Sequence, residues 1–459
     1  MSESTTDDTL EQMIHSSENM AETFRNNDLK WQPYVFPDEY TNWIEEQRAV
    51  SESCAVVDQS YHQDTLRIEG PDAIDLLSKL SVNSFEKIRS GDPPQAMNYV
   101  TCNPDGYVIG DAILFQLGEN DFTSVGTEWI NNWIRYHAEV NDFEVCTEVL
   151  YDPFDERPPH DFRFQIQGPD ALSVLEEVVD NTLPEISFFG MDSIQINGAE
   201  IFALRHGMAG TLGLEIFGPY DCHDEVLNDI LEAGQKYEIR QMGSKAYKTG
   251  KIGIGWFVMS VPAIYENEQL KEYREWLSDD SMEATLSIGG SYESENITDY
   301  YMTPMERGQA NLIDFDHEFI GKAALEKMVD NQKRERVTLV WDVDAVVDIY
   351  ASLFRDGETN QFIEMPDVAT QWSDTHYDKI LKEGEVVGIS KYPGYLYTKR
   401  EMLSLATINL EYSEPGTEVT FVWGDDTEKL SVERNEQVKV SATVAPSPYV
   451  QDGRKADRG

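Results

Sequence analysis

The stretch Leu66–Leu80, LRIEGPDAIDLLSKL, has a counterpart at Phe164–Val178, FQIQGPDALSVLEEV. The two are offset by 98 positions, the step from Gly70 to Gly168. In each, an alternating run predicts a strand, the Gly permits a sharp turn, and Pro and Asp suit the first turn of a helix. Because strand, turn and apolar helix positions all match, the chain contains two related β-α units.

Composition indicates a globular protein with an unusual charge. The 459 residues allow about three domains. Hydrophobic residues at 40% and aromatic residues at 11% are ordinary, so the 85 acidic against 36 basic residues do not indicate disorder. We interpret the net charge of −49 as a solvated shell suited to a salt-rich cytoplasm, where about 1 M salt shortens the Debye length to roughly 3 Å. An acidic protein of an ordinary cytoplasm is the alternative. This charge repels phosphate backbones, so we expect no nucleic-acid partner.

The sequence has no signature of export, membrane insertion or metal binding. Its four cysteines show no CxxC spacing and are predicted to be reduced thiols. The first residues, MSESTTDDTLEQM, do not resemble a signal peptide, and no apolar stretch approaches the ~20 residues of a membrane span. No HExxH or comparable pattern is present, so no metal is expected. We predict a cytoplasmic protein with no membrane partner.

Changes in composition and hydrophobic pattern along the chain predict three domains between two terminal segments. The predicted units are an acidic flexible leader (1–29), a first α/β domain (30–150), a second α/β domain with segments returning to the first (151–335), a β-barrel or sandwich domain (336–452) and a tail (453–459). Helices are expected at 38–48, 224–237 and 270–276, and strands at 96–102 and 108–116. Asn197 and Gly198 between alternating runs predict a hairpin.

Several motifs, in order along the chain, resemble one family. They are VVDQSYH (56–62), IEGPDA (68–73), CNPDGYVIGDAILF (102–115), RHGMAGTLGLEIFGP (205–219) and TPMERGQANLIDFDHEFIGKAAL (303–325). Together they resemble the folate-dependent aminomethyltransferases, the T-protein family of glycine cleavage, and within it the tetrahydrofolate-dependent aryl O-demethylases of the vanillate and syringate type. The resemblance implies an α+β fold of three domains around a central hole that holds the folate, with the two β-α units in the N-terminal domains and an all-β barrel or sandwich at the C-terminus.

The resemblance also implies a tetrahydrofolate site. Glu215, in GLEIFG, is carried over as the carboxylate that accepts the paired N–H donors of the pterin ring. Gln59 and Trp256 are expected at the same ring, the first through its amide and the second by stacking. Asp111 is the remaining member of an acidic pair that aminomethyltransferases carry in the loop matching VIGDA.

Methyl transfer from an ether oxygen needs alignment of the methyl carbon and a proton or hydrogen bond for the departing oxygen. Tyr247 and His62 are the catalytic candidates. Tyr34 and Thr127 are the candidates for substrate binding, with simple packing as the alternative for Tyr34.

Two departures from the family pattern bear on the reaction. Gly110 replaces the first acidic residue of the pair, which removes support for aminomethyl chemistry. Thr127 stands where aryl O-demethylases have a carboxylate-binding Arg, and the next residue, Glu128, would disfavour a carboxylate through like charge. Arg205 is the nearest motif cation and the candidate to replace that anchor.

The sequence therefore predicts an enzyme that moves a methyl group from a small donor, expected to be a methoxylated aromatic, to tetrahydrofolate, without an obligatory protein partner. The alternatives are a glycine-cleavage aminomethyltransferase, which would need a lipoyl carrier protein, a dimethylsulfoniopropionate-type demethylase, and a non-catalytic folate-binding protein. Scaffold relatives with a KGCY-type motif carry a Cys that this chain lacks near Tyr247.

Overall fold

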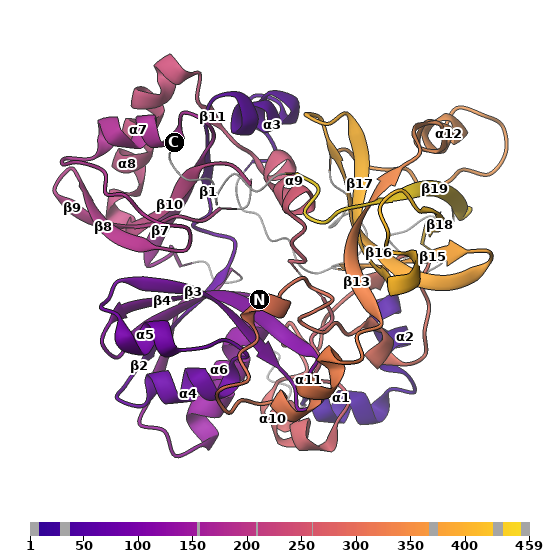
Figure 1. Ribbon diagram of the computed structural model, residues 1–459, viewed down its shortest axis with the longest axis horizontal. Coiled ribbons are helices and arrows are strands. Elements are labelled where there is room, and N and C mark those ends of the chain that lie inside the picture. Colours follow the sequence, from indigo (N-terminus) through magenta and orange to yellow (C-terminus); the bar gives the residue numbers. More distant parts are fainter. Residues whose placement is uncertain are drawn as a thin grey trace.

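Three β-structures organise the chain, and each β-α unit belongs to a different sheet (Figure 1). The computed structural model describes residues 9–27, 37–153, 157–207, 210–258, 260–366, 375–425 and 435–450. Within these residues there are a five-stranded sheet, a six-stranded sheet and a closed six-stranded barrel. This arrangement confirms the predicted α+β fold with two related sheet domains and a C-terminal barrel.

The first β-α unit lies in the five-stranded sheet, whose order is β3-β4-β5-β2-β6. Its strands are β2 (Asp64–Glu69), β3 (Gln95–Cys102), β4 (Val108–Gly118), β5 (Asp121–Gly126) and β6 (Cys146–Tyr151). The helices of this part are α4 (Ala73–Leu80), α5 (Glu86–Ser90) and α6 (Glu128–Val140). Every neighbouring pair is antiparallel, and short turns join β3 to β4 and β4 to β5.

The second β-α unit lies in the six-stranded sheet, of order β11-β1-β7-β10-β9-β8. Its strands are β1 (Ala55–Asp58), β7 (Asp161–Gln167), β8 (Met191–Ile196), β9 (Ala199–Leu204), β10 (Gly213–Pro219) and β11 (Arg240–Gln241). The helices α7 (Ala171–Val178) and α8 (His223–Gly234) pack on one face, against the apolar side chains of β7 and β10. The hairpin between β8 and β9 turns at Asn197 and Gly198, as predicted, with φ of 53° and 73°.

One segment expected in the first domain lies in the second. β1 follows α3 (Trp43–Glu52) and pairs with β7 in antiparallel and with β11 in parallel orientation. The predicted boundary at 150 misses this crossing because both partners of β1 come more than 100 residues later in the chain. The helix predicted at 38–48 is shifted toward the C-terminus, since Asn42 caps its first turn by accepting from the Glu45 N–H.

The glycines of both units are required by close backbone approaches. Gly70 and Gly168 have φ of 151° and 134°. A Cβ on Gly70 would overlap the carbonyl oxygen of Glu144, and one on Gly168 would overlap that of Ser53. Each unit therefore turns from strand to helix against a neighbouring chain segment that leaves no space for a side chain.

The barrel closes in the order β13-β17-β16-β15-β18-β19. Its strands are β13 (Arg334–Trp341), β15 (Asp378–Lys382), β16 (Glu385–Leu396), β17 (Glu401–Asn409), β18 (Glu418–Trp423) and β19 (Val438–Ala445). Trp341, Phe421 and Trp423 fill its interior. The expectation of an all-β domain is incomplete, because α12 (Val343–Ser352) packs Val346 and Ile349 onto the barrel core.

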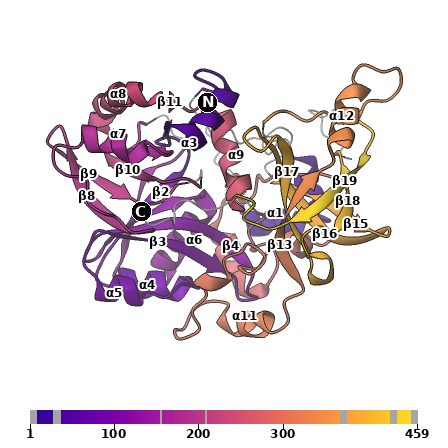
Figure 2. The same ribbon diagram turned by 45° about the horizontal axis from the view of Figure 1, so that its top comes forward.

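The chain between the second sheet and the barrel returns to the first sheet. Phe257, Ile264, Tyr273 and Tyr300 share one hydrophobic cluster with residues of the five-stranded sheet. The returning part contains α10 (Lys271–Trp276), α11 (Lys322–Val329) and the two-residue strand β12 (Ile288–Gly289), which pairs with β14 (Thr375–His376). Before it, α9 (Ser244–Ile254) lies between the six-stranded sheet and the barrel in both views (Figures 1 and 2).

The expectation of a loose leader is wrong for residues 9–27. They form α1 (Leu10–Ser16) and α2 (Met20–Asn26), and Leu10 and Phe24 are fully buried in the first core. Their few apolar side chains all face the protein, which composition alone does not reveal. No helix among the described residues has the length and apolar character needed to cross a bilayer.

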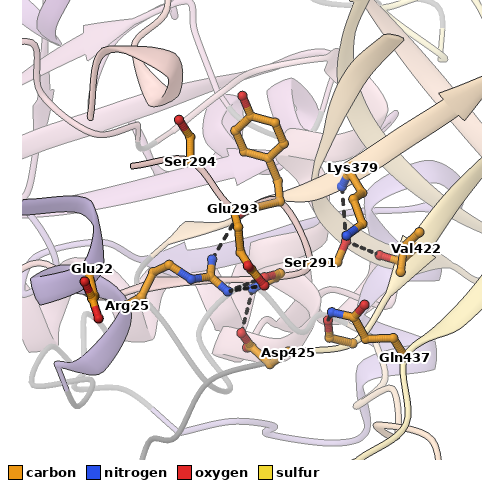
Figure 3. A network of polar contacts seen from close by, with 12 residues as sticks. Glu22, Arg25, Ser291, Glu293, Ser294, Lys379, Val422, Asp425 and Gln437 are labelled. Carbon is orange, nitrogen blue, oxygen red and sulfur yellow. Dashed lines mark hydrogen bonds and ion pairs between the residues drawn. The ribbon is translucent and has the colours of Figure 1, made fainter. Parts of the chain in front are cut away.

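Arg25 of α2 ties this segment to the returning chain and, through it, to the barrel. Its Nη2 donates to the Gly290 carbonyl at 2.9 Å and its Nη1 to the Tyr292 carbonyl at 3.0 Å. The Gly290 N–H donates in turn to Asp425 Oδ1 at 2.8 Å, just beyond β18 (Figure 3). The N-terminal helices therefore join two domains.

Candidate functional site

A cavity of about 570 Å³ lies where the two sheets, α9 and the returning chain meet. Most of the predicted site residues line it: Gln59, Asp111, Glu215, Tyr247 and Trp256. They come from four segments that are far apart in the sequence, so the fold brings them together. The cavity volume is in the usual range of small-molecule sites, roughly 300–1,000 Å³.

Strand alternation directs Glu215 into this cavity. On β7 and β10, Phe164 and Ile216 face the helices of the second domain. Their neighbours Gln165 and Glu215 are register partners and point to the opposite face. A carboxylate within GLEIFG is therefore placed on the inner side of the sheet by the same pattern that builds the core.

Glu215 is a buried carboxylate held in its charged form. Its side chain is only 4% exposed, and Oε1 lies 3.2 Å from Nδ1 of His206. Burial acts to raise the pKa of Glu215, but His206 and the guanidinium of Arg163 outweigh it, so the pKa lies below its ordinary value. An ionised acceptor at a cavity wall is suited to a ligand with adjacent N–H donors.

Tyr247 is fixed by two side chains that follow β1. Gln59 Nε2 lies 2.7 Å from the Tyr247 hydroxyl oxygen and 2.9 Å from Oε1 of Gln165, so its amide donates to both. His62 Nε2 lies 3.3 Å from the same hydroxyl. The tyrosine oxygen is thus oriented from two sides.

The tautomer of His62 follows from its other ring nitrogen. Nδ1 lies 3.0 Å from the carbonyl oxygen of Gln59, which only accepts, so Nδ1 carries the hydrogen. Burial lowers the pKa of His62 to about 4, which keeps the ring neutral at pH 7. Nε2 is therefore an acceptor for the Tyr247 hydroxyl. His62 is not among the described residues that line the cavity, and its Nε2 faces the Tyr247 hydroxyl, which does line it.

Asp111 lines the cavity, but its oxygens already accept three hydrogen bonds. Oδ1 accepts from Arg307 Nη2 at 2.6 Å, and Oδ2 accepts from Gln309 Nε2 at 3.0 Å and from Trp256 Nε1 at 3.3 Å. This arrangement favours a role in holding Trp256 and Arg307 at the wall over direct ligand binding.

Three predicted elements of substrate binding are not brought to the cavity. Thr127 precedes α6 and is not among the described residues that line it. Glu128 faces Asn132 Nδ2 at 3.3 Å, and burial, with Glu283 nearby, raises its pKa to about 7, so it does not oppose a ligand there. Arg205 donates to the Ile186 carbonyl at 3.2 Å and is not among the described residues that line the cavity. Tyr34 lies outside the described residues.

Sequence reasoning missed three residues at or near the cavity. His206 and Arg307 line the cavity and lie inside the motifs at 205–219 and 303–325, so their place in those motifs is the available signal. Arg163 lies in DFRFQIQ, where a cation on the non-core face of an otherwise buried strand is the available signal.

A second cavity, of about 630 Å³, shares Tyr247 with the first and is lined by Arg48, Lys399 and others.

Comparison with known proteins identifies related chains. The family model of the GCVT N-terminal domain matches residues 18–261. The chain is 37% identical over 453 residues, 96% of each chain, to the syringate O-demethylase of Sphingobium sp. (strain NBRC 103272 / SYK-6). It is 27% identical to the sesamin methylene transferase of Sinomonas sp. (strain No.22), covering 83% of this chain and 82% of that protein.

The fold matches a solved structure as well. The glycine cleavage system aminomethyltransferase T from Bartonella henselae superposes with a TM-score of 0.62 at 16% identity, covering 94% of this chain and 96% of that one. The chain therefore belongs to the GCVT family and is an enzyme of its tetrahydrofolate-dependent transferase kind.

Proposed function

We propose that the protein demethylates a small methoxylated aromatic compound and transfers the methyl group to tetrahydrofolate, giving 5-methyltetrahydrofolate. The observation that carries this proposal is the Tyr247 hydroxyl, held 2.7 Å from Gln59 Nε2 and 3.3 Å from His62 Nε2 at the cavity that Glu215 also lines. The similarity to a syringate O-demethylase over 96% of both chains supports the donor class.

The cavity residues fit a reduced pterin. The ring presents an amino group and a ring N–H side by side, and the buried, ionised Glu215 carboxylate accepts such a pair. Trp256 offers an indole wall whose Nε1 is anchored 3.3 Å from Asp111 Oδ2. We assign binding of the pterin to Glu215 and the adjacent wall to Trp256. Bound tetrahydrofolate would supply the nucleophilic nitrogen that receives the methyl group.

Tyr247 is suited to assist the departing oxygen. Gln59 donates to the Tyr247 oxygen, which leaves the hydroxyl hydrogen for one acceptor at a time. When no methyl donor is bound, the acceptor is His62 Nε2. The His62 ring is neutral because burial lowers its pKa to about 4. With an aryl ether in place, the hydrogen turns to the ether oxygen and stabilises the phenolate that forms when the methyl carbon is displaced.

The structure also weighs against aminomethyl chemistry. A Cβ at Gly110 would lie 2.9 Å from the Trp129 ring and 3.0 Å from Ile130 Cβ, so this position has no space for a second acidic side chain. Asp111 is already engaged by Arg307, Gln309 and Trp256. These two observations support demethylation over a glycine-cleavage reaction.

The test is formation of 5-methyltetrahydrofolate by the purified protein from tetrahydrofolate and syringate. A panel of methoxyaromatics, dimethylsulfoniopropionate and methylated amines defines the donor class. Product from a methoxyaromatic without any added protein supports the proposal. A requirement for a lipoyl carrier protein with release of ammonia contradicts it, as does folate binding without product from any donor.

We further propose that the enzyme acts alone in the cytoplasm on small molecules. The net charge of −49 disfavours nucleic acid and anionic membrane surfaces as partners. Full activity of the isolated chain at molar potassium chloride, without a second protein, is the expected result.

A further inference from the structure

The helix α12 carries apolar side chains on both of its faces. Its inner face packs Val346 and Ile349 onto the barrel core. Its outer face presents Val343 and Val347, which are 66% and 57% exposed. A surface helix is ordinarily polar on the face opposite the core, and a helix that is apolar all round is ordinarily covered on both sides.

Exposed apolar side chains are concentrated in this helix and the residues just after it. Ten large apolar side chains are exposed among the described residues, and half of them lie between 343 and 362: Val343, Val347, Leu353, Phe354 and Phe362. Single exposed apolar residues are ordinary, but a contiguous group of them marks an interaction surface. In both views α12 lies at the edge of the barrel away from the two sheets, so a partner bound there would leave the catalytic cavity open (Figures 1 and 2).

Four apolar positions form one stripe along this face, at intervals of four, three and four residues: Val343, Val347, Tyr350 and Phe354. Residues three or four apart lie on the same face of a helix, and the Phe354 N–H donates to the Ala351 carbonyl, which continues the last turn. The intervals are the same in both directions along the chain. Two antiparallel copies therefore match, with Val343 opposite Phe354 and Val347 opposite Tyr350, so that a small side chain meets a large one at each step.

The charges beside the stripe favour the same antiparallel arrangement. Asp344 lies in the first turn of α12, whereas Arg355 follows its last turn and is 66% exposed. Within one chain Arg355 pairs with Asp348 at 3.2 Å, an exposed pair that contributes little to stability. In an antiparallel pair of helices, Arg355 of each copy lies near Asp344 of the other. Such complementary charges select an orientation more than they supply affinity.

We propose that the outer face of α12 binds the same face of a second copy of this chain, with the two helices antiparallel about a twofold axis. Each copy then supplies the same stripe to the contact. The stripe from 343 to 354 is about 17 Å long at 1.5 Å per residue. One helix per copy buries less than the roughly 800 Å² per partner of a standard interface, so we expect a weak dimer with a Kd on the order of 10 μM.

The net charge of the chain determines the conditions in which this dimer forms. Two copies that each carry a charge of −49 repel one another in dilute buffer. About 1 M salt shortens the Debye length to roughly 3 Å, which screens the repulsion but leaves the contact between apolar stripes. The dimer should therefore become tighter as potassium chloride is added, whereas a contact made by ion pairs would become weaker.

The test is sedimentation equilibrium of the full chain in 1 M potassium chloride, over a range of about 1 to 300 μM. The average mass is expected to rise from that of one chain toward that of two. Val347→Asp places a charge in the middle of the stripe in both copies, so it should weaken association by roughly 30-fold or more. Wild-type protein that stays monomeric at the highest concentration assigns this face to another partner and overturns the inference.

The matched control is Val140→Asp, which makes the same change in α6 at a valine that is 54% exposed. Its dimer Kd should stay within about twofold of the wild-type value. Val347 lies outside the barrel core, so Val347→Asp should melt at the wild-type temperature. Equal weakening in both variants, or in neither, overturns the inference. A lower melting temperature in Val347→Asp alone would show that the chain itself covers this face, which also overturns it.

Cross-linking tests the orientation without a charge in the stripe. Val343→Cys and Phe354→Cys are each made with Cys146→Ser and Cys222→Ser, which remove the two cysteines that are not buried. A short bismaleimide is added to each variant alone and to their mixture. Cross-linked dimers in the mixture but in neither variant alone support the antiparallel contact. Cross-links within each variant alone indicate a parallel pair, and none in any sample indicates a different surface, and both results overturn the inference.

Discussion

The two β-α units have the same backbone plan, but one supports solvent-facing strands and the other supports the site. On β2 the non-core face carries Arg67, which is 37% exposed and pairs with Asp121 of the adjacent strand. At the equivalent position of β7 stands Gln165, which is 1% exposed and bonded to Gln59. The register partner of Gln165 on the adjacent strand is Glu215.

The difference comes from what covers each face. On the polar side of β7, Phe115 of the five-stranded sheet packs on Arg163, and Gln59, which also bonds Tyr247 of α9, covers Gln165. The same face of β2 has no such cover at Arg67. A repeated scaffold therefore encloses a cavity where other segments cover its polar face, and the repeat itself does not dictate which copy does so.

The largest expected effect on stability is at the glycine turn that the two β-α units share. Gly168→Ala and Gly70→Ala should each destabilise the protein by roughly 3–5 kcal/mol, because a side chain would meet a backbone carbonyl in a left-handed conformation. Gly384→Ala is the control: its φ is 93° but nothing lies within 4 Å, so it should cost about 1 kcal/mol. Chemical denaturation measures all three. A mild effect in only one copy would show that the two turns are not equivalent.

Tyr247→Phe tests the function of the enclosed face. Loss of the hydroxyl should lower kcat by about 100- to 1,000-fold, because the departing oxygen loses its hydrogen-bond donor. Tetrahydrofolate affinity should be unchanged. Steady-state kinetics with syringate and calorimetry provide the two readouts. Undiminished turnover would remove Tyr247 from the reaction.

Glu215→Ala changes β10, the strand next to β7, and its control changes β5, the strand next to β2. It should weaken tetrahydrofolate binding by about 10- to 100-fold, because it deletes a charged acceptor. The matched control is Asp121→Asn on β5, which removes a carboxylate from the exposed face of the first copy and should leave affinity unchanged. Calorimetry is the measurement. Equal affinities in wild type and Glu215→Ala would exclude Glu215 from the folate site.

Asp64→Asn should have the smallest effect, and it should stabilise the protein where the glycine substitutions destabilise it. Asp64 occupies the core-side position that Phe162 has in the second copy, and burial raises its pKa from 3.8 to about 7. The folded state therefore favours the protonated form, and this contribution to stability is lost as pH rises through 7. The amide should raise the free energy of unfolding at pH 8 by about 1–2 kcal/mol.

The pH profile of that gain is the check. At pH 4 the wild-type carboxyl is already protonated when folded, so the two proteins should have similar stability. Denaturation at the two pH values measures the difference. A gain of the same size at both would assign it to packing, and a loss at pH 8 would contradict the raised pKa.

Features that depend on residues close together in the sequence were predictable. The Gly-Pro-Asp turns, the Asn197-Gly198 hairpin and the alternating runs of the barrel depend on neighbouring residues, and each appears in the structure. The family motifs indicated Glu215, Gln59 and Tyr247, which do line one cavity. Their roles there stay predictions.

Features that depend on distant partners were not predictable. β1 joins the second sheet because its partner β7 lies more than 100 residues away, and no local signal records that pairing. Glu128 was expected at the donor because it follows Thr127, but the start of α6 turns it toward Asn132. Arg163 was not predicted because its burial between Phe115 and Phe217 depends on the packing of one sheet on the other.

The docking of α1 and α2 has a consequence for the order of events during synthesis. These helices have seven residues each, too few to be stable in isolation. Their partners, such as Leu277 and Gly290, leave the ribosome more than 250 residues later. The earliest part of the described chain is therefore among the last to acquire its structure, and the growing polypeptide carries Leu10 and Phe24 uncovered until the middle of the protein has been made.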